Sequence, residues 1–133
     1  MDYKDDGIGK FQDKVSETLF LHRSILDSLS KYQEMSTRIN RSVIKTVTYC
    51  GCLSINARKQ QFPLNASLGE CRKYLESHVE GSLCETCREA IEQEIGNSLF
   101  YLAAVCHLLG LKLDDVIEKE IQRLNTLGSY RLS

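Results

Sequence analysis

A single proline, Pro63, stands in a chain of 133 residues. Proline ends or kinks a helix, and few glycines occur in clusters, so the sequence favours long uninterrupted helices. Apolar residues recur at steps of three and four, which is the spacing of one helix face. The helices expected from this spacing span residues 10–35, 39–57, 67–79, 85–109 and 114–128. No segment alternates apolar and polar residues as a strand does. We therefore predict an all-α fold, a bundle of about five helices.

Composition limits the classes of function open to this chain. The 17 basic and 18 acidic side chains nearly cancel, to a formal net charge of -1, which argues against electrostatically driven nucleic-acid binding. No apolar run reaches the ~20 residues that cross a bilayer, and the polar start carries no secretion signal. We expect a cytoplasmic protein without membrane or nucleic-acid partners. Residues 1–7 overlap the start of a common epitope tag and are interpreted as a mobile tail, native or not, before a single domain over 8–133.

Four of the six cysteines form two closely spaced pairs, Cys50-Gly51-Cys52 and Cys84-Glu85-Thr86-Cys87. Four thiolates in a tetrahedron are a common Zn²⁺ site, and paired spacings of this kind are typical of one. Residues i and i+2 point apart on a helix, so the first pair requires a non-helical turn, which Gly51 permits. The sequence therefore predicts a metal site at Cys50, Cys52, Cys84 and Cys87, with His78 as a substitute for one cysteine.

Two other interpretations of these cysteines stay open. A helix N-terminus lowers the pKa of a thiol, which would make Cys84 or Cys87 a redox-active group. Free cysteine is also among the most buried residue types, so an inert role is open too. An Fe–S cluster would use the same ligands. Cys71 and Cys106 lie in apolar stripes and are expected in the core.

One helical segment carries a family resemblance. It reads Glu94-Ile95-Gly96-Asn97-Ser98-Leu99-Phe100-Tyr101-Leu102-Ala103-Ala104, and Leu108-Leu109-Gly110 and an acidic helix start at Asp114 follow. This pattern resembles the MazG-like nucleotide pyrophosphohydrolases over residues 92–124. The resemblance implies an all-α bundle, a dimer or tetramer, and a nucleotide ligand. It also implies Mg²⁺ held by carboxylates in E-E-x-x-E and E-x-x-D motifs on facing helices, where the ion neutralises charge at phosphorus.

Most of those carboxylates have no counterpart here. Glu94 matches the first position of E-x-x-D, but Asn97 replaces the aspartate, and residues 36–61 contain no acidic side chain. This argues against Mg²⁺. If the helices on either side of the cysteines run antiparallel, Arg41 and Lys45 come level with Glu94, at about ten residues or ~15 Å from the cysteines. We predict that these two cations are charge partners of Glu94, against the alternative that they form a solvated basic face.

Three hypotheses about function follow. The first is a MazG-like domain that no longer hydrolyses triphosphates efficiently, with a metal joining two helices. The second is an active pyrophosphohydrolase with a rearranged carboxylate site. The third is a thiol-based redox or metal sensor. The candidate residues for the second hypothesis are Glu94, Asn97 and Glu92, together with Glu89 and Glu17.

Overall fold

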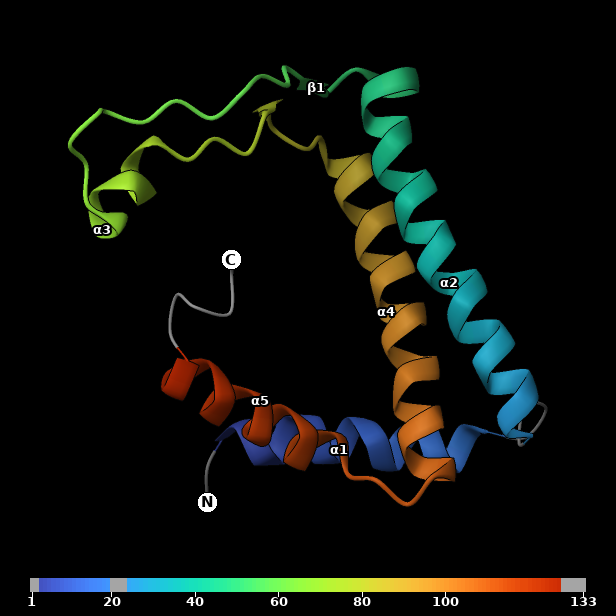
Figure 1. Ribbon diagram of the computed structural model, residues 1–133. Helices are drawn as coiled ribbons and strands as arrows, with labels where there is room; N and C mark the ends of the chain where they lie inside the picture. The colour runs from blue at the N-terminus through green and yellow to red at the C-terminus, as the bar shows by residue number, and fades with distance from the viewer. Residues whose placement is uncertain (1–2, 20–23, 128–133) are drawn as a thin grey trace. The chain divides into compact units, whose positions relative to one another are not determined.

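The computed structural model describes residues 3–19 and 24–127, and this part of the chain is mostly helical. The coarse prediction of an α-helical fold is thereby confirmed. None of the described helices has the length and apolar character that a bilayer crossing requires. The elements in chain order are α1 (Tyr3–Thr18), α2 (Ile25–Lys45), the π-helical turn η1 (Thr46–Cys50), β1 (Leu53–Ile55), α3 (Leu68–Cys71), the 3₁₀ turn η2 (Arg72–Tyr74), β2 (Val79–Gly81), α4 (Glu85–Leu108) and α5 (Leu113–Leu127) (Figure 1).

The chain divides into two compact units. The first, called here the terminal unit, combines residues 1–38 with residues 94–133, and the second, the central unit, spans residues 39–93. Helices α2 and α4 each contribute residues to both units. The terminal unit holds α1, α5, the part of α2 up to residue 38 and the part of α4 from residue 94. The central unit holds β1, β2, α3 and the two turns.

An apolar cluster forms the core of the terminal unit. Its alanines, Ala103 and Ala104, have no exposed surface, and small side chains there let helices approach closely. Helices α1 and α5 lie side by side in this unit (Figure 1). Close-packed apolar groups of this kind supply most of the stability of a small domain. The buried members of the cluster are Val15, Leu19, Ala103, Ala104, Cys106 and Leu113.

A buried glutamine ties α1 to the loop between α4 and α5. Gln12, 9% exposed, donates from Nε2 to the Leu111 carbonyl at 2.8 Å and accepts from the Leu113 N–H at 2.8 Å. The loop begins at Leu109, directly after α4, and Gly110 has φ of 73°. The Leu111 N–H then donates to the Cys106 carbonyl at 2.8 Å, closing the helix end in a Schellman motif.

The expected helix over 10–35 is wrong, because α1 ends at Thr18 and α2 begins at Ile25. Ser24 starts the new helix: its Oγ accepts from the Leu26 N–H at 3.3 Å, and its carbonyl accepts from Ser28 at 3.0 Å. Serine is a preferred N-cap, so this signal was present in the sequence. The apolar spacing of the expected helix places His22 and Leu26 on its inward face. His22 lies outside the described residues, and Leu26 is 72% exposed, so its inward placement is wrong.

The central unit differs most from the prediction. The helix expected over 39–57 ends in η1 at Cys50, and the one expected over 67–79 is reduced to α3 and η2. Two short strands, β1 and β2, pair antiparallel with Leu53 opposite Gly81 and Ile55 opposite Val79. Strands of three residues are too short to show an alternating pattern. The helices expected over 85–109 and 114–128 are confirmed, as α4 and α5.

Candidate metal centre

The first cysteine pair follows a helix end that is closed by glycine. Gly51 has φ of 82°, a left-handed conformation that glycine adopts without a side-chain clash. Its N–H donates to the Thr46 carbonyl at 2.8 Å, which ends η1 at Cys50 and turns the chain toward Cys52. Thr46 is fully buried and donates from Oγ1 to the Val43 carbonyl at 2.6 Å, which anchors the turn. The turn that the C-x-C spacing required is therefore present.

The two strands bring the second cysteine pair to the first. Leu53, next to Cys52, lies opposite Gly81, three residues before Cys84. Gly81 has φ of 90°, and a Cβ on it would lie 2.4 Å from the Cys52 carbonyl oxygen. Only glycine fits such a close backbone approach. Antiparallel pairing of β1 and β2, called here the β-ribbon, thus places Cys52 and Cys84 at the same end of the ribbon.

The second cysteine pair forms the start of α4. The Cys84 carbonyl accepts from the Arg88 N–H at 2.9 Å, and its Sγ accepts from the Cys87 N–H at 3.4 Å. Cys84 therefore acts as the N-cap of α4, where a sulfur replaces the usual side-chain oxygen. Cys87 lies one turn further on, and its Sγ can face the same point as that of Cys84.

The four sulfurs form one cluster that could hold a metal ion. The Sγ atoms of Cys50, Cys52, Cys84 and Cys87 all lie within 4.8 Å of one another. The Cys50 and Cys84 sulfurs are 3.8 Å apart. Cys50 is exposed, and the other three are half-buried. All four residues belong to the central unit. Because their sulfurs lie this close together, the predicted clustering is confirmed.

Proton sharing within the cluster gives its thiols different acidities. The backbone N–H of Cys87, with a further contribution from its side chain, lowers the pKa of Cys84 to about 7. The hydrogen bond between the Cys84 and Cys87 side chains, together with desolvation, raises the pKa of Cys87 to about 12. In the metal-free site, Cys84 is therefore the first of these two groups to become a thiolate, which is the form that binds metals.

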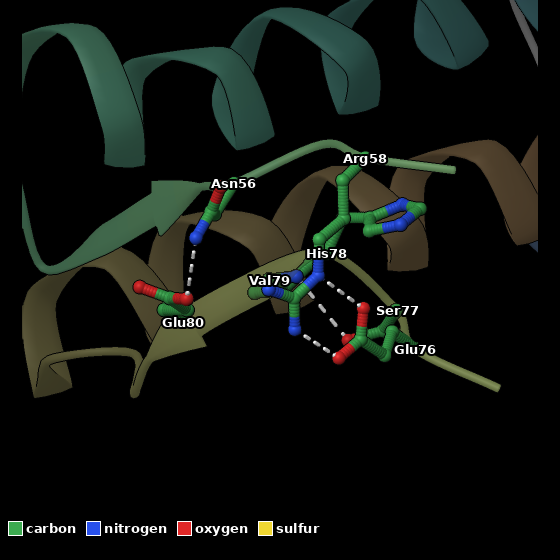
Figure 2. Close-up of a pocket in the computed structure, with 7 residues that line it drawn as sticks. All are labelled: Asn56, Arg58, Glu76, Ser77, His78, Val79 and Glu80. Atoms are coloured by element: carbon green, nitrogen blue, oxygen red, sulfur yellow. Dashed lines mark hydrogen bonds and ion pairs between the residues drawn. The ribbon is translucent and has the colours of Figure 1, made fainter. Parts of the chain in front are cut away.

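The prediction that Cys71 and Cys106 lie in the core is confirmed for Cys106 only. Cys106 is 6% exposed in the core of the terminal unit, and burial raises the pKa of its thiol. Cys71 ends α3 and is half-buried rather than part of a core. His78 is not a member of the sulfur cluster. It directly precedes β2 and lines a cavity, with φ of 63° (Figure 2).

The candidate catalytic residues lie along α4. Glu94 is half-buried, and its Oε2 is buried with no hydrogen-bond partner among the described residues. Asn97 is half-buried, and Glu92 is exposed. Arg41 and Lys45 are exposed residues of the central unit, whereas Glu94 belongs to the terminal unit. The proposed charge pairing with Glu94 therefore stays a prediction.

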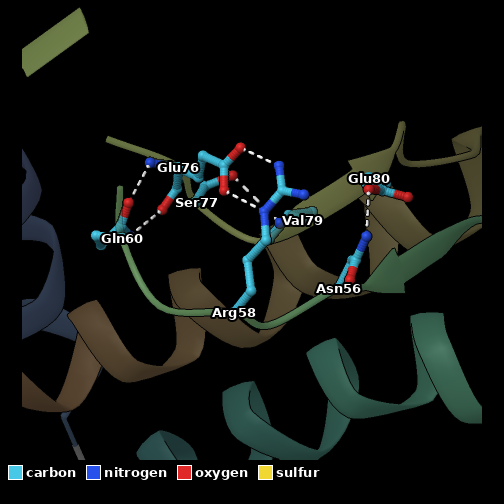
Figure 3. A network of polar contacts seen from close by, with 7 residues as sticks. All are labelled: Asn56, Arg58, Gln60, Glu76, Ser77, Val79 and Glu80. Carbon is cyan, nitrogen blue, oxygen red and sulfur yellow. Dashed lines mark hydrogen bonds and ion pairs between the residues drawn. The ribbon is translucent and has the colours of Figure 1, made fainter. Parts of the chain in front are cut away.

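Sequence reasoning missed a polar network that continues the pairing beyond β1 and β2. Arg58 donates two hydrogen bonds to the Glu76 carboxylate, the one from Nε to Oε2 at 2.8 Å (Figure 2). The side chain of Gln60 donates to the Glu76 carbonyl at 2.8 Å and accepts from its N–H at 2.9 Å (Figure 3). Asn56 donates from its side chain to Glu80 at 3.2 Å.

This network borders a cavity of about 260 Å³. The hydrogen bonds between Arg58 and Glu76 raise the pKa of the Arg58 guanidinium and lower the pKa of the Glu76 carboxyl. No local sequence motif predicts the pairing of Arg58 with Glu76, because the two residues are 18 positions apart and lie on irregular backbone. These contacts link the two segments of the connection beyond the ends of β1 and β2. The network therefore adds local contacts next to the register that the strands set.

The chain matches no family model, no curated protein and no solved structure.

Proposed function

We propose that the cysteine cluster is a structural zinc centre within a divergent MazG-like domain that does not hydrolyse nucleoside triphosphates efficiently. The observation that carries the metal part is the convergence of four sulfurs from two separate segments. A closed site of four thiolates leaves no open position for water or substrate. The metal would therefore stabilise the fold rather than perform a reaction.

The spacing of the sulfurs supports a single ion of the size of zinc. Four ligands at ~2.3 Å from one ion in a tetrahedron lie ~3.8 Å from one another. The Cys50 and Cys84 sulfurs are 3.8 Å apart. A cluster of several irons would need more room, because its irons and sulfides occupy the space between the thiolates. The donor set of four soft sulfurs also favours zinc over magnesium or calcium, which prefer oxygen.

The non-hydrolytic part of the proposal depends on residues that are missing. Magnesium needs several oxygen ligands, and the segment 36–61 has no carboxylate to offer. Glu92 and Glu89 are exposed on α4. Among the described residues, carboxylates do not gather into an octahedral site, so no step of triphosphate hydrolysis is assigned to them. A domain of this kind would act by binding a partner, a nucleotide or a second copy of itself. The resemblance to MazG-like proteins supports a homo-oligomer, a dimer or a tetramer.

X-ray absorption at the zinc edge tests the metal part of this proposal. Reduced protein loaded with zinc is expected to give four sulfur neighbours at ~2.3 Å. Nitrogen or oxygen neighbours in place of sulfur would contradict it. A pyrophosphate-release assay across the common nucleotides, with Mg²⁺ and with Mn²⁺, tests the catalytic part. We expect no turnover above the rate without protein.

One observation favours an active enzyme as the second candidate. Glu94 keeps a buried carboxylate oxygen without a partner, which is costly unless a cation or another group pairs with it. In this case Glu94 and Asn97 would bind the ion, with a rearranged set of carboxylates. Turnover that is abolished by Glu94→Gln, and retained by the control Glu118→Gln at an exposed position of α5, would establish this candidate and overturn the first.

A further inference from the structure

One sulfur of the cluster is open to reagents, and it lies next to a sulfur from the other segment. Cys50 is exposed, whereas Cys52, Cys84 and Cys87 are half-buried. Its sulfur is 3.8 Å from that of Cys84. The S–S bond of a disulfide is ~2.05 Å, so these two sulfurs must approach by roughly 1.8 Å to form one. The contact links segments that are 34 residues apart in the chain.

We propose that hydrogen peroxide converts this centre into a Cys50–Cys84 disulfide and expels the metal. This inference rests on the proposed zinc centre and describes its regulation. It makes Cys50 the oxidation site and Cys84 the resolving residue. The cluster would then exist in two covalent states: reduced with metal, and oxidised without it.

The chemistry proceeds in two steps that balance. The Cys50 thiolate attacks one oxygen of peroxide, the O–O bond breaks, and a sulfenic acid forms with release of hydroxide. The Cys84 thiolate then attacks the Cys50 sulfur, the S–OH bond breaks, and a second hydroxide leaves. Two protons from solvent convert the two hydroxides into water. The cysteines lose two electrons in total, and peroxide gains them.

Loss of two ligands explains why the metal would leave. After the reaction only the sulfurs of Cys52 and Cys87 remain as ligands, and a two-sulfur site binds zinc far more weakly than a four-sulfur site. The disulfide also takes over one role of the metal, since it joins the turn at Gly51 to the start of α4. Oxidation would therefore release zinc without separating the two segments. A disulfide between Cys84 and Cys87 would not join them.

The test uses the full chain with zinc bound, and its zinc content is measured before oxidant is added. Peroxide is then titrated in, a chromogenic chelator reports released zinc, and peptide mapping under non-reducing conditions locates disulfides. We expect one zinc ion released for each Cys50–Cys84 link. We also expect dithiothreitol and added zinc to restore the starting state. The Cys71→Ser variant, altered outside the cluster, should behave as wild type.

The outcomes separate this inference from the proposed function. Bound zinc that resists peroxide, or that leaves while a different cysteine pair forms, overturns the inference and leaves the zinc centre in place. Absence of bound metal before oxidation overturns both. Cys50→Ser adds a check if it still binds zinc: it should lose zinc to peroxide at least tenfold more slowly than wild type. An equal rate would contradict the role of Cys50.

Discussion

Different interactions stabilise each of the two units of this chain. The terminal unit has a core of buried apolar residues that includes Val15, Ala104 and Leu113. The central unit buries little: Thr46 and Ile91 are its buried residues among those described, and it exposes Phe62 and Leu64. Its order comes from paired strands, a polar network and the cysteine cluster. A segment of this size with so small a core needs a covalent or metal link, and here the four sulfurs can supply one.

Metal removal gives the largest expected difference between the two units. Chelation of reduced protein should abolish hydrogen-exchange protection of the amides around Cys52, Gly81 and Cys84. The amides of α1 and the second half of α4 should keep theirs, because their core contains no metal ligand. Exchange measured by mass spectrometry with and without chelator gives the comparison. Equal loss of protection in both units would contradict the division.

A core truncation should give the opposite pattern. Leu113→Ala removes a side chain that is 7% exposed and should cost ~2–4 kcal/mol in the free energy of unfolding. The matched control is Leu124→Ala on the same helix, since Leu124 is 44% exposed and should cost ~1 kcal/mol or less. Chemical denaturation followed by circular dichroism measures both. Metal affinity should not change in either variant, and a change would mean that the two units are coupled.

Cysteine reactivity sharpens the same contrast with one residue type. In metal-free protein the pKa of Cys84 is lowered to about 7, whereas burial raises the pKa of Cys106. Iodoacetamide at pH 7.5 should therefore alkylate Cys84 at a rate at least roughly tenfold higher than that of Cys106. The rate at Cys84 should rise as pH passes upward through 7 and then level off, because its thiolate forms there. A Cys84 rate that still climbs steeply above pH 8 would contradict the lowered pKa.

Glycine substitutions test the close approach at the ribbon. Gly81→Ala places a Cβ 2.4 Å from the Cys52 carbonyl oxygen at a φ of 90°, so it should destabilise the folded protein by ~1–3 kcal/mol and weaken metal binding. The control is Gly96→Ala in α4, where a Cβ meets nothing within 4 Å. That change should stabilise the protein by ~0.5–1 kcal/mol. Thermal unfolding of the two variants should therefore shift in opposite directions.

The smallest effect is expected at Arg58. The Arg58–Glu76 pair is solvent-exposed, and water screens it, so Arg58→Ala should leave global stability close to that of wild type. The loss should be local, as faster hydrogen exchange at Glu76 and its neighbours. A large drop in stability or in zinc content would show that this pair, rather than the sulfurs, holds the connection in place.

The sequence allowed the cluster to be predicted more reliably than the fold around it. The paired spacings of Cys50, Cys52, Cys84 and Cys87 point to one site whatever connects them. The helices α4 and α5 were also predictable, because their apolar residues keep helical spacing over many turns and Gly110 follows the end of α4. The ribbon was not, since its strands are short and depend on pairing across the chain. The fit of Gly81 against Cys52 is a tertiary contact that no local pattern contains.

The most direct test of the account is the metal content of reduced, untagged protein, measured by inductively coupled plasma mass spectrometry. Wild type and Cys71→Ser should each carry one zinc ion per chain, and Cys84→Ser should carry none. That result would establish the four-sulfur centre as the link that orders the central unit. Metal-free wild type, with all six thiols titrating and hydrogen exchange unaffected by added zinc, would contradict it.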